Sequence, residues 1–254
     1  GTDSAAGNNA AQYGYGTMTG TIAMDMIAGI PTYVGNFNAV INGQGFFIVR
    51  SNKADITNED LKSSGCSFTR VGQFTVDNNG YIVDSGNNFV FGFLKEDPDD
   101  PDSSYQTDTL KPLRLTDVEG NIIEGDDDEP AIASSIEINN MGIITAKITD
   151  QDGNEKTVTI GKVAIASFQN PEGLTKSGGH YFTTNGNDNA GDCTASEPGS
   201  GSTPSLMTGY VEGSNVDLAK EFSELIMAQR GFQANSKIIT VSDEILNELV
   251  NMKR

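Results

Sequence analysis

The sequence predicts a mainly β protein, with a sandwich-like or barrel-like β-domain of short hairpins and one long C-terminal α-helix. Only 36% of the 254 residues are hydrophobic, 29 are glycine and none is tryptophan, a composition that suits short strands joined by turns. Between residues 36 and 209, short apolar runs alternate with turns rich in Asn and Gly. Residues 210–254 instead repeat apolar side chains at steps of three and four, as an amphipathic helix does.

Residues 1–35 are expected to form a weakly structured lead-in segment. The chain opens GTDSAAGNNAAQYGYG, which is rich in Gly and Ala and has no strand or helix period. This opening also lacks the charged and apolar regions of a cleavable signal peptide. No apolar run approaches the roughly 18 residues that a membrane-spanning helix needs, so no membrane insertion is expected.

A discontinuous β core domain is expected from residues 36–94 and 134–209. In the first part, Gly43 and Gly45 favour a tight turn or bulge beside an apolar run. Further along, DNNG at residues 77–80 separates FTV from YIV and predicts a hairpin, because Asn and Gly tolerate the positive φ of short turns.

The second part of the core contains a change of apolar parity. Val158 and Ile160 occupy even positions, whereas Val163 and Ile165 occupy odd ones. Side chains alternate between the two faces of a strand, so the switch would send half of them to the wrong face. We therefore expect a bulge at Gly161 that keeps both halves on one core.

An acidic insertion, residues 95–133, is expected to form a small outer excursion between the two parts of the core. Residues 93–130 hold 13 acids and three bases, which is −10 of the formal net charge of −19. The acids concentrate in DPDDPD (Asp97–Asp102) and DDDE (Asp126–Glu129). The formal net charge of −19 argues strongly against a nucleic-acid binder, which needs clustered Lys and Arg for phosphate contacts.

Calcium is the one ligand that the acidic clusters suggest, since Ca²⁺ is bound by loop carboxylates. Neither cluster has the D-x-[DN]-x-[DN]-G spacing of an EF-hand, and a solvated acidic loop is the commoner role. A secreted, acidic, calcium-dependent binding module therefore stays as an alternative function. No cofactor and no metal ligand is predicted.

Catalysis is not expected. His180 is the only histidine, which excludes most catalytic triads and multi-histidine metal sites. Cys66 and Cys193 have no basic sequence neighbour that would lower a thiol pKa, and their spacing leaves open whether they pair. The acids lie in Pro-broken loops without tryptophan, unlike the paired carboxylates of a glycosidase.

Residues 210–254 predict one long amphipathic helix. Ser214 is a candidate N-cap, with Asp217 as a carboxylate in the first turn. Gly231 lies inside the expected helix and should soften it. A helix this long needs another helix to cover its apolar side, so the stripe is predicted to mediate assembly. The stripe consists of Leu218, Phe222, Leu225, Phe232, Ile239, Leu246 and Val250.

The same segment resembles a known family. GYVEGSNVDLAKEF, AQRGFQANSKII and the terminal LVNMKR are similar to the C-terminal signature of bacterial flagellar axial proteins, and of hook proteins in particular. NFNAVINGQGFFIV (residues 36–49), FTRVGQFTVD (68–77) and FQNPEGLTKSGGHY (168–181) resemble further motifs of that family in the same order. The family's N-terminal helix has no counterpart in this chain, so the resemblance implies a longer native polypeptide.

The resemblance implies a structural subunit without catalysis. Hook proteins self-assemble into a helical tube that passes torque from motor to filament, and their subunits leave the cell by flagellar type III export. The implied partners are further copies of the chain, other flagellar axial proteins and hook-associated proteins. The implied location is extracellular, in the hook or basal body of the bacterial flagellum. The related distal-rod proteins are the alternative. QANSKII and LVNMKR favour the hook.

Overall fold

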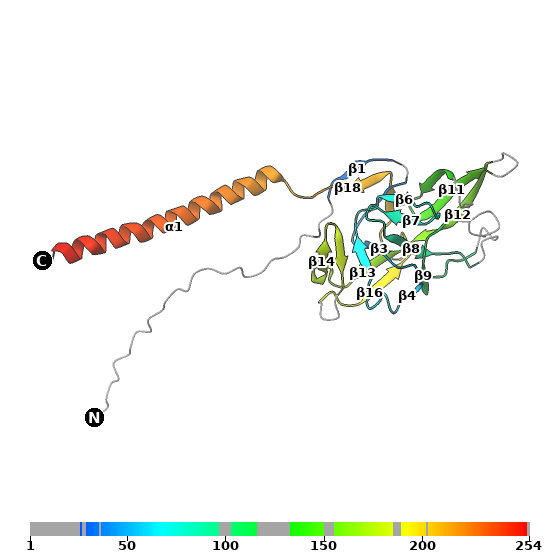
Figure 1. Cartoon of the computed structure of the whole chain (residues 1–254), viewed down its shortest axis with the longest axis horizontal. Helices are drawn as coiled ribbons and strands as arrows, with labels where there is room; N and C mark the ends of the chain where they lie inside the picture. The colour runs from blue at the N-terminus through cyan, green and yellow to red at the C-terminus, as the bar shows by residue number, and fades with distance from the viewer. Residues whose placement is uncertain are drawn as a thin grey trace, which may run out of the picture.

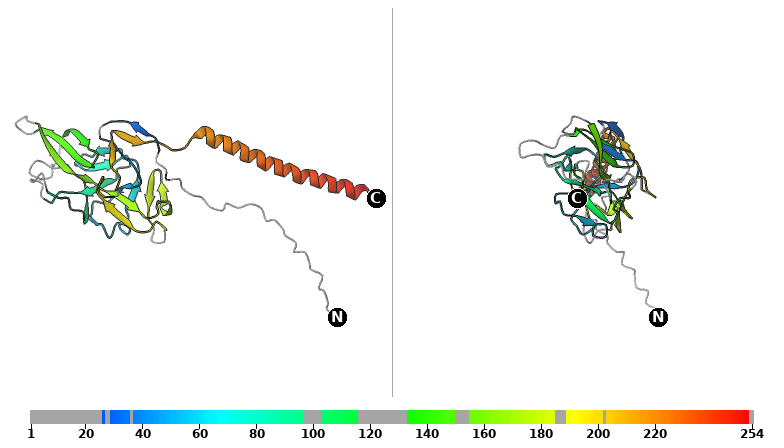
Figure 2. Two further views of the ribbon diagram at one scale, coloured as in Figure 1. Left: turned by 180° about the vertical axis from the view of Figure 1, so that it is seen from behind. Right: turned by 90° about the vertical axis from the view of Figure 1, so that its right-hand side faces the viewer.

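A computed structural model of the chain has an elongated shape, with a β-domain at one end and a helix that extends away from it (Figures 1 and 2). The structure describes residues 26, 29–35, 37–96, 103–115, 133–149, 155–184, 189–201 and 203–252. Within them, the helix α1 (Leu218–Met252) contributes no residue to the β-domain, and none of its side chains is buried.

The strands are short, as the many turns require. Before the acidic segment they are β1 (Pro31–Tyr33), β2 (Ala39–Ile41), β3 (Phe46–Arg50), β4 (Ile56–Thr57), β5 (Ser67–Thr69), β6 (Phe74–Val76), β7 (Ile82–Asp84) and β8 (Phe89–Phe93). The later strands are β9 (Thr109–Pro112), β10 (Ala133–Ile138), β11 (Ile143–Thr149), β12 (Glu155–Val163), β13 (Ile165–Phe168), β14 (Thr175–Gly178), β15 (Tyr181–Thr183), β16 (Cys193–Ser196), β17 (Leu206–Thr208) and β18 (Tyr210–Glu212). A single 3₁₀ turn, Pro171–Gly173, lies between β13 and β14.

Most strands belong to one extended antiparallel network whose longest path runs β10-β11-β12-β8-β3-β5-β15-β14. Two separate two-stranded ribbons, β1-β18 and β17-β2, join segments that lie far apart in the sequence. The prediction of a mainly β domain with one long C-terminal helix is confirmed, although the sheets do not close into a barrel.

Strand β3 is buried on both faces and organises the core. Phe47 and Val49 lie in one apolar cluster, whereas Phe46 and Ile48 lie in the other. The Phe47 ring packs edge-on against Phe74, with 5.2 Å between ring centroids. Burying each of these side chains stabilises the fold by about 1.5–3 kcal/mol. Because the apolar run GFFIV has such side chains on both faces of the strand, it is most stable in the centre of the core.

Local turn chemistry places the hairpins where the sequence predicts them. The DNNG turn joins β6 to β7, and Gly80 adopts a φ of 79°. The Asp77 carboxylate accepts hydrogen bonds from the N–H groups of Asn79 and Tyr81, at 2.9 and 2.8 Å. The expected bulge is also present, because the β11-β12 register slips between Ile144, opposite Gly161, and the next pair.

Two of the expected boundaries are wrong. Residues 103–115 belong to the β-domain, where β9 pairs with both β4 and β8, and Leu110 and Leu113 are fully buried. Strand β1 lies inside the expected lead-in, yet it pairs with β18. Within the expected excursion, residues 97–102 and 116–132 lie outside the described residues.

Candidate assembly helix and its junction

The helix α1 begins at Leu218, and its cap is Asp217. The Asp217 carboxylate accepts hydrogen bonds from the N–H groups of Ala219 and Lys220, at 2.9 and 3.3 Å. Ser214 lies outside the helix, and its hydroxyl accepts a hydrogen bond from the N–H of Val216 instead. The proposed Ser214 cap is therefore wrong, because Asp217 is the residue that satisfies the first free N–H groups.

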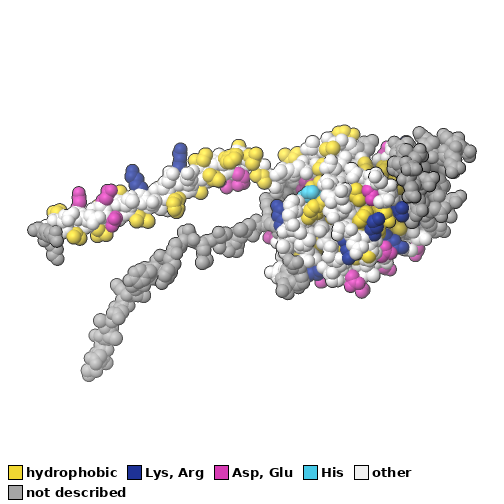
Figure 3. All heavy atoms as spheres, viewed as in Figure 1, with side chains coloured by type: hydrophobic (Ala, Val, Ile, Leu, Met, Phe, Trp, Pro, Cys, Tyr) yellow, Lys and Arg dark blue, Asp and Glu magenta, His cyan; other side chains and the backbone are white. Residues whose placement is uncertain are grey.

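The seven residues of the predicted stripe all lie on α1 and are all solvent-exposed. Their exposed fractions range from 60% at Leu225 to 74% at Phe232. Figure 3 shows hydrophobic side chains along the helix, away from the β-domain. With 35 residues, α1 is about 52 Å long at 1.5 Å per residue, so it extends well beyond its own domain. Among the described residues, therefore, nothing covers the stripe.

A second apolar face was missed by the sequence reasoning. At about 100° per residue, the predicted stripe occupies one side of α1, while another set of apolar residues lies roughly opposite. These residues are also exposed, from 43% at Val241 to 83% at Met252. The second face consists of Met227, Ile238, Val241, Ile245, Leu249 and Met252. Polar side chains such as Gln233 and Asn235 lie between the two faces, together with the exposed Ile226 on one side.

The junction between α1 and the β-domain is the β1-β18 ribbon. Thr32 lies opposite Val211, and the rings of Tyr33 and Tyr210 meet edge-on with 5.6 Å between centroids. Past the ribbon, the N–H of Gly213 donates a hydrogen bond to the carbonyl of Ile30 at 3.0 Å. The chain segments before β1 and after β18 therefore reach the domain at the same place.

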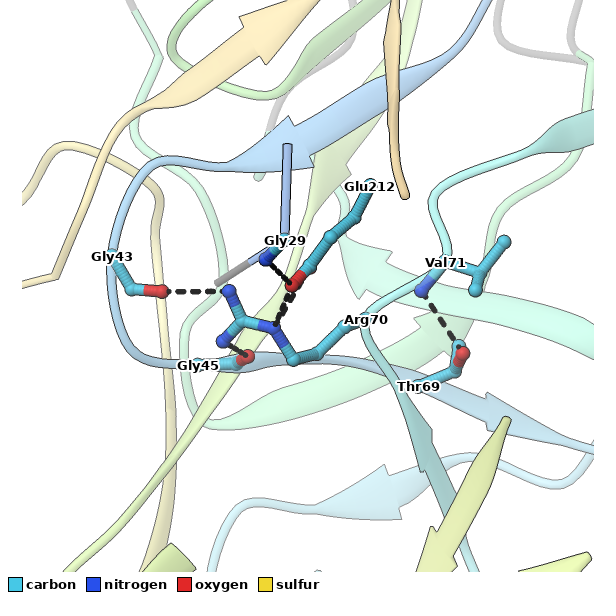
Figure 4. Close-up of polar contacts among 7 residues, drawn as sticks. All are labelled: Gly29, Gly43, Gly45, Thr69, Arg70, Val71 and Glu212. Carbon is cyan, nitrogen blue, oxygen red and sulfur yellow. Dashed lines mark hydrogen bonds and ion pairs between the residues drawn. The ribbon is translucent and has the colours of Figure 1, made fainter. Parts of the chain in front are cut away.

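Arg70 ties this ribbon to the β-domain (Figure 4). Its Nε donates to both carboxylate oxygens of Glu212, at 3.1 and 2.8 Å. Its two terminal nitrogens donate to the carbonyls of Gly45 and Gly43, at 3.2 and 3.0 Å. Glu212 also accepts a hydrogen bond from the N–H of Gly29 at 3.0 Å. The side chains of Arg70 and Glu212 are only 12% and 11% exposed, so water screens this ion pair weakly.

We call this arrangement the Arg70 clasp: Arg70, Glu212, Gly29, Gly43 and Gly45. Sequence reasoning did not find it, because its members come from four separate stretches of the chain. Arg70 and Glu212 do lie within the motifs FTRVGQ and GYVEG, and Gly43 and Gly45 lie within NFNAVINGQGFFIV, but nothing in these motifs indicates that they meet.

The residues considered for chemistry do not form a reactive site. Burial raises the pKa of the Cys193 thiol to about 12 and raises that of Cys66 as well, so both thiols are protonated at neutral pH. The two cysteines are free. His180 is half-buried against Tyr181, with 4.2 Å between ring centroids, and its Nε2 has no hydrogen-bond partner.

No group of three or more His, Cys, Asp or Glu side chains in the described part of the chain could hold a metal ion. Both acidic clusters that suggested calcium, Asp97–Asp102 and Asp126–Glu129, lie outside the described residues. Among the described residues, no helix is both long and apolar enough to cross a membrane.

Known proteins resemble this chain along its length. A family described as the flagellar basal body rod FlgEFG protein C-terminal region matches residues 207–252. The flagellar basal-body rod protein FlgG of Bacillus subtilis is 33% identical over 249 residues, which cover 98% of this chain and 77% of that protein. The FlgG protein of Buchnera aphidicola is 30% identical over 212 residues, covering 84% of this chain and 63% of that protein.

Hook proteins match a shorter region. The flagellar hook protein FlgE of Borreliella burgdorferi is 47% identical over 94 residues, which cover 37% of this chain and 21% of that protein. The FlgE protein of Escherichia coli is 34% identical over 125 residues, covering 49% of this chain and 30% of that protein. These relatives are components of the flagellum and not enzymes, and the chain belongs to their family of flagellar hook and basal-body rod proteins.

Proposed function

We propose that this chain is a self-assembling subunit of the flagellar hook, which polymerises through α1 into a helical tube that passes torque from motor to filament. The observation that carries the proposal is the exposure of α1. Its apolar side chains are uncovered over the whole 35-residue helix. So large an apolar surface is unfavourable in water and is typical of a protein–protein interface. A polymer of this chain would bury it.

The two apolar faces of α1 favour a polymer over a simple dimer. A two-helix pair covers one stripe of each helix and would leave the opposite face of α1 in water. Helices packed on both sides would cover Phe232 on one face and Ile245 on the other. Such contacts are heterologous, so they repeat from copy to copy and generate a ring or a helical array.

The hook and the distal rod are the two candidates for the assembled object. High local identity supports the hook, with 47% over 94 residues of a hook protein. The end-to-end match to a rod protein, over 98% of this chain, makes the distal rod the second candidate. In both cases, the proposed partners are further copies of the chain, other flagellar axial proteins and, for the hook, hook-associated proteins.

The test is to place a charge on the predicted stripe. Phe232→Asp in the native full-length polypeptide should abolish polymerisation, because each contact would have to bury an unpaired carboxylate. Gln233→Asp is the matched control: it adds the same charge one residue away, between the two apolar faces. The β-domain of both variants should melt at the wild-type temperature, since α1 contributes no buried side chain to it.

Electron microscopy of the assemblies provides the readout. Curved tubes from the wild-type polypeptide would support the hook, and straight, short assemblies would support the distal rod. Normal tubes from the Phe232→Asp variant would refute the assignment of the stripe to assembly.

A further inference from the structure

We propose that Arg70 is a positioning residue: it fixes the β1-β18 ribbon to the β-domain and thereby sets where α1 begins. If the proposed function holds, the Arg70 clasp is also the point through which load passes from the assembled helices to the β-domain. The positioning role itself concerns the single chain and does not depend on assembly.

The ribbon has little apolar burial to hold it in place. All three residues of β1 are exposed, and those of β18 are only half-buried. At the end of the ribbon nearer β2, backbone hydrogen bonds link Gly209 to Asn38 and to Val34. At the end nearer α1, Arg70 and Glu212 provide the ion pair that crosses from the ribbon to the domain. The ribbon is therefore held there mainly by polar contacts.

The shape of the guanidinium suits this position. Arg70 donates in two directions, to the Glu212 carboxylate and to the carbonyls of Gly43 and Gly45, which both lie just before the start of β3. A lysine has a single nitrogen and cannot span these acceptors at once. One side chain thus connects the exit strand β18 to the turn that leads into the central strand of the core.

Loss of Arg70 would affect the ribbon more than the core. Glu212, whose side chain is only 11% exposed beside Arg70, would keep its hydrogen bond from the N–H of Gly29 but would lose its counter-charge. A buried charge left without its partner is strongly unfavourable. If β18 detaches from the domain, the unpaired Glu212 carboxylate is hydrated by water. The loss of Arg70 should therefore favour the open state of the ribbon.

Hydrogen exchange measured by mass spectrometry on the 254-residue chain tests the proposal. Arg70→Ala should speed exchange in the peptides that cover β1 and β18 by on the order of a hundredfold. Exchange in β3 and β8 should stay close to the wild-type rate. Arg70→Lys keeps the positive charge but replaces the several N–H donors of the guanidinium with one nitrogen. The exchange rate in the same peptides should therefore lie between those of the wild type and Arg70→Ala.

The matched control removes another partly buried ion pair of the same domain. Lys162 donates to Glu197 at 2.7 Å, and these side chains are 5% and 22% exposed. Lys162→Ala should speed exchange around β12 and leave the ribbon peptides unchanged. A ribbon response to Lys162→Ala as large as that to Arg70→Ala would show general destabilisation and overturn the proposal.

A milder variant covers the case in which Arg70→Ala does not fold. Glu212→Gln retains an acceptor for Gly29 and removes only the charge, so it should speed exchange in the ribbon by a smaller factor. Wild-type exchange in the ribbon of Glu212→Gln, or of a folded Arg70→Ala, would refute the positioning role. Hydrogen exchange is measured on the 254-residue chain and requires no polymer. The positioning role can therefore fail or hold independently of the Phe232→Asp polymerisation test.

Discussion

Replacing Gly231 with alanine should stiffen α1 without affecting the β-domain. Gly231 lies in the middle third of the helix, and a Cβ built there would meet no atom within 4 Å. Its φ lies outside the left-handed region, so alanine fits the existing backbone. The added methyl group therefore creates no clash in the single chain, and the change acts through helix propensity alone.

The expected gain is about 1 kcal/mol, the difference between glycine and alanine inside a helix. Gly231 lies within the continuous 35-residue helix and is the point at which helix propensity is lowest. Isolated helices shorter than about 12–15 residues are marginal in water, so the piece before Gly231 should fray first. With no buried side chain on α1, tertiary packing within the chain does not mask this effect.

Circular dichroism at 222 nm as a function of temperature provides the assay. Gly231→Ala should raise the helical signal at low temperature and shift the broad helix transition upward, with the β-domain transition unchanged. Ala234→Gly is the reverse control on the same helix and should lower the signal by a similar amount. A reduced helical signal in Gly231→Ala, or a shifted β-domain transition, would refute the reasoning.

Three further predictions concern the cap, pH and the core. Asp217→Ala should destabilise the start of α1 by about 1 kcal/mol, seen as faster amide exchange in its first turn, whereas Asp217→Asn should not. Burial and the 2.8 Å hydrogen bond to Asp84 raise the pKa of Tyr181 from 10.0 to about 12. The protonated phenol therefore stabilises the fold fully below pH 10.0, and this contribution is lost as the pH rises through about 12. Urea unfolding at pH 8 to 11 should show a shallower loss in Tyr181→Phe, and equal slopes would contradict the assignment. Gly72→Ala would place a Cβ 1.9 Å from the carbonyl oxygen of Ala39. This clash should lower the free energy of unfolding by about 3 kcal/mol. A loss below about 1 kcal/mol would count against the packing described for Gly72.

Short-range chemistry made much of the fold predictable. The DNNG turn and the parity switch at Gly161 each depend on a few neighbouring residues, and both lie where the sequence predicts a hairpin and a bulge. The run GFFIV places apolar side chains on both faces of β3, and the structure buries both. Turn type and strand parity are local properties, so a single sequence contains them.

Long-range pairing was not predictable in the same way. Strand β1 meets β18 about 180 residues later, and PTY has no apolar period to distinguish it from a loop. Leu110 and Leu113 pack into the core although they lie between the acidic runs at residues 97–102 and 126–129. Average acidity therefore concealed a core segment. The misplaced cap has a different cause, since Ser214 and Asp217 are both good caps and the backbone path chooses between them.

The second apolar face of α1 changes what the proposed assembly must provide. The predicted stripe, which includes Phe232, covers only one side of the helix. Ile245 and Leu249 lie roughly opposite that stripe and are 54% and 58% exposed, so a single partner helix would leave them in water. Each Å² of apolar surface removed from water stabilises the assembly by about 25 cal/mol, so covering both faces of α1 is more favourable than covering one. A helix in a closed layer has a neighbour on each side. A subunit of this kind gains most from α1 when its copies surround one another, and a ribbon held by the Arg70 clasp keeps the start of each helix in the same place on every copy.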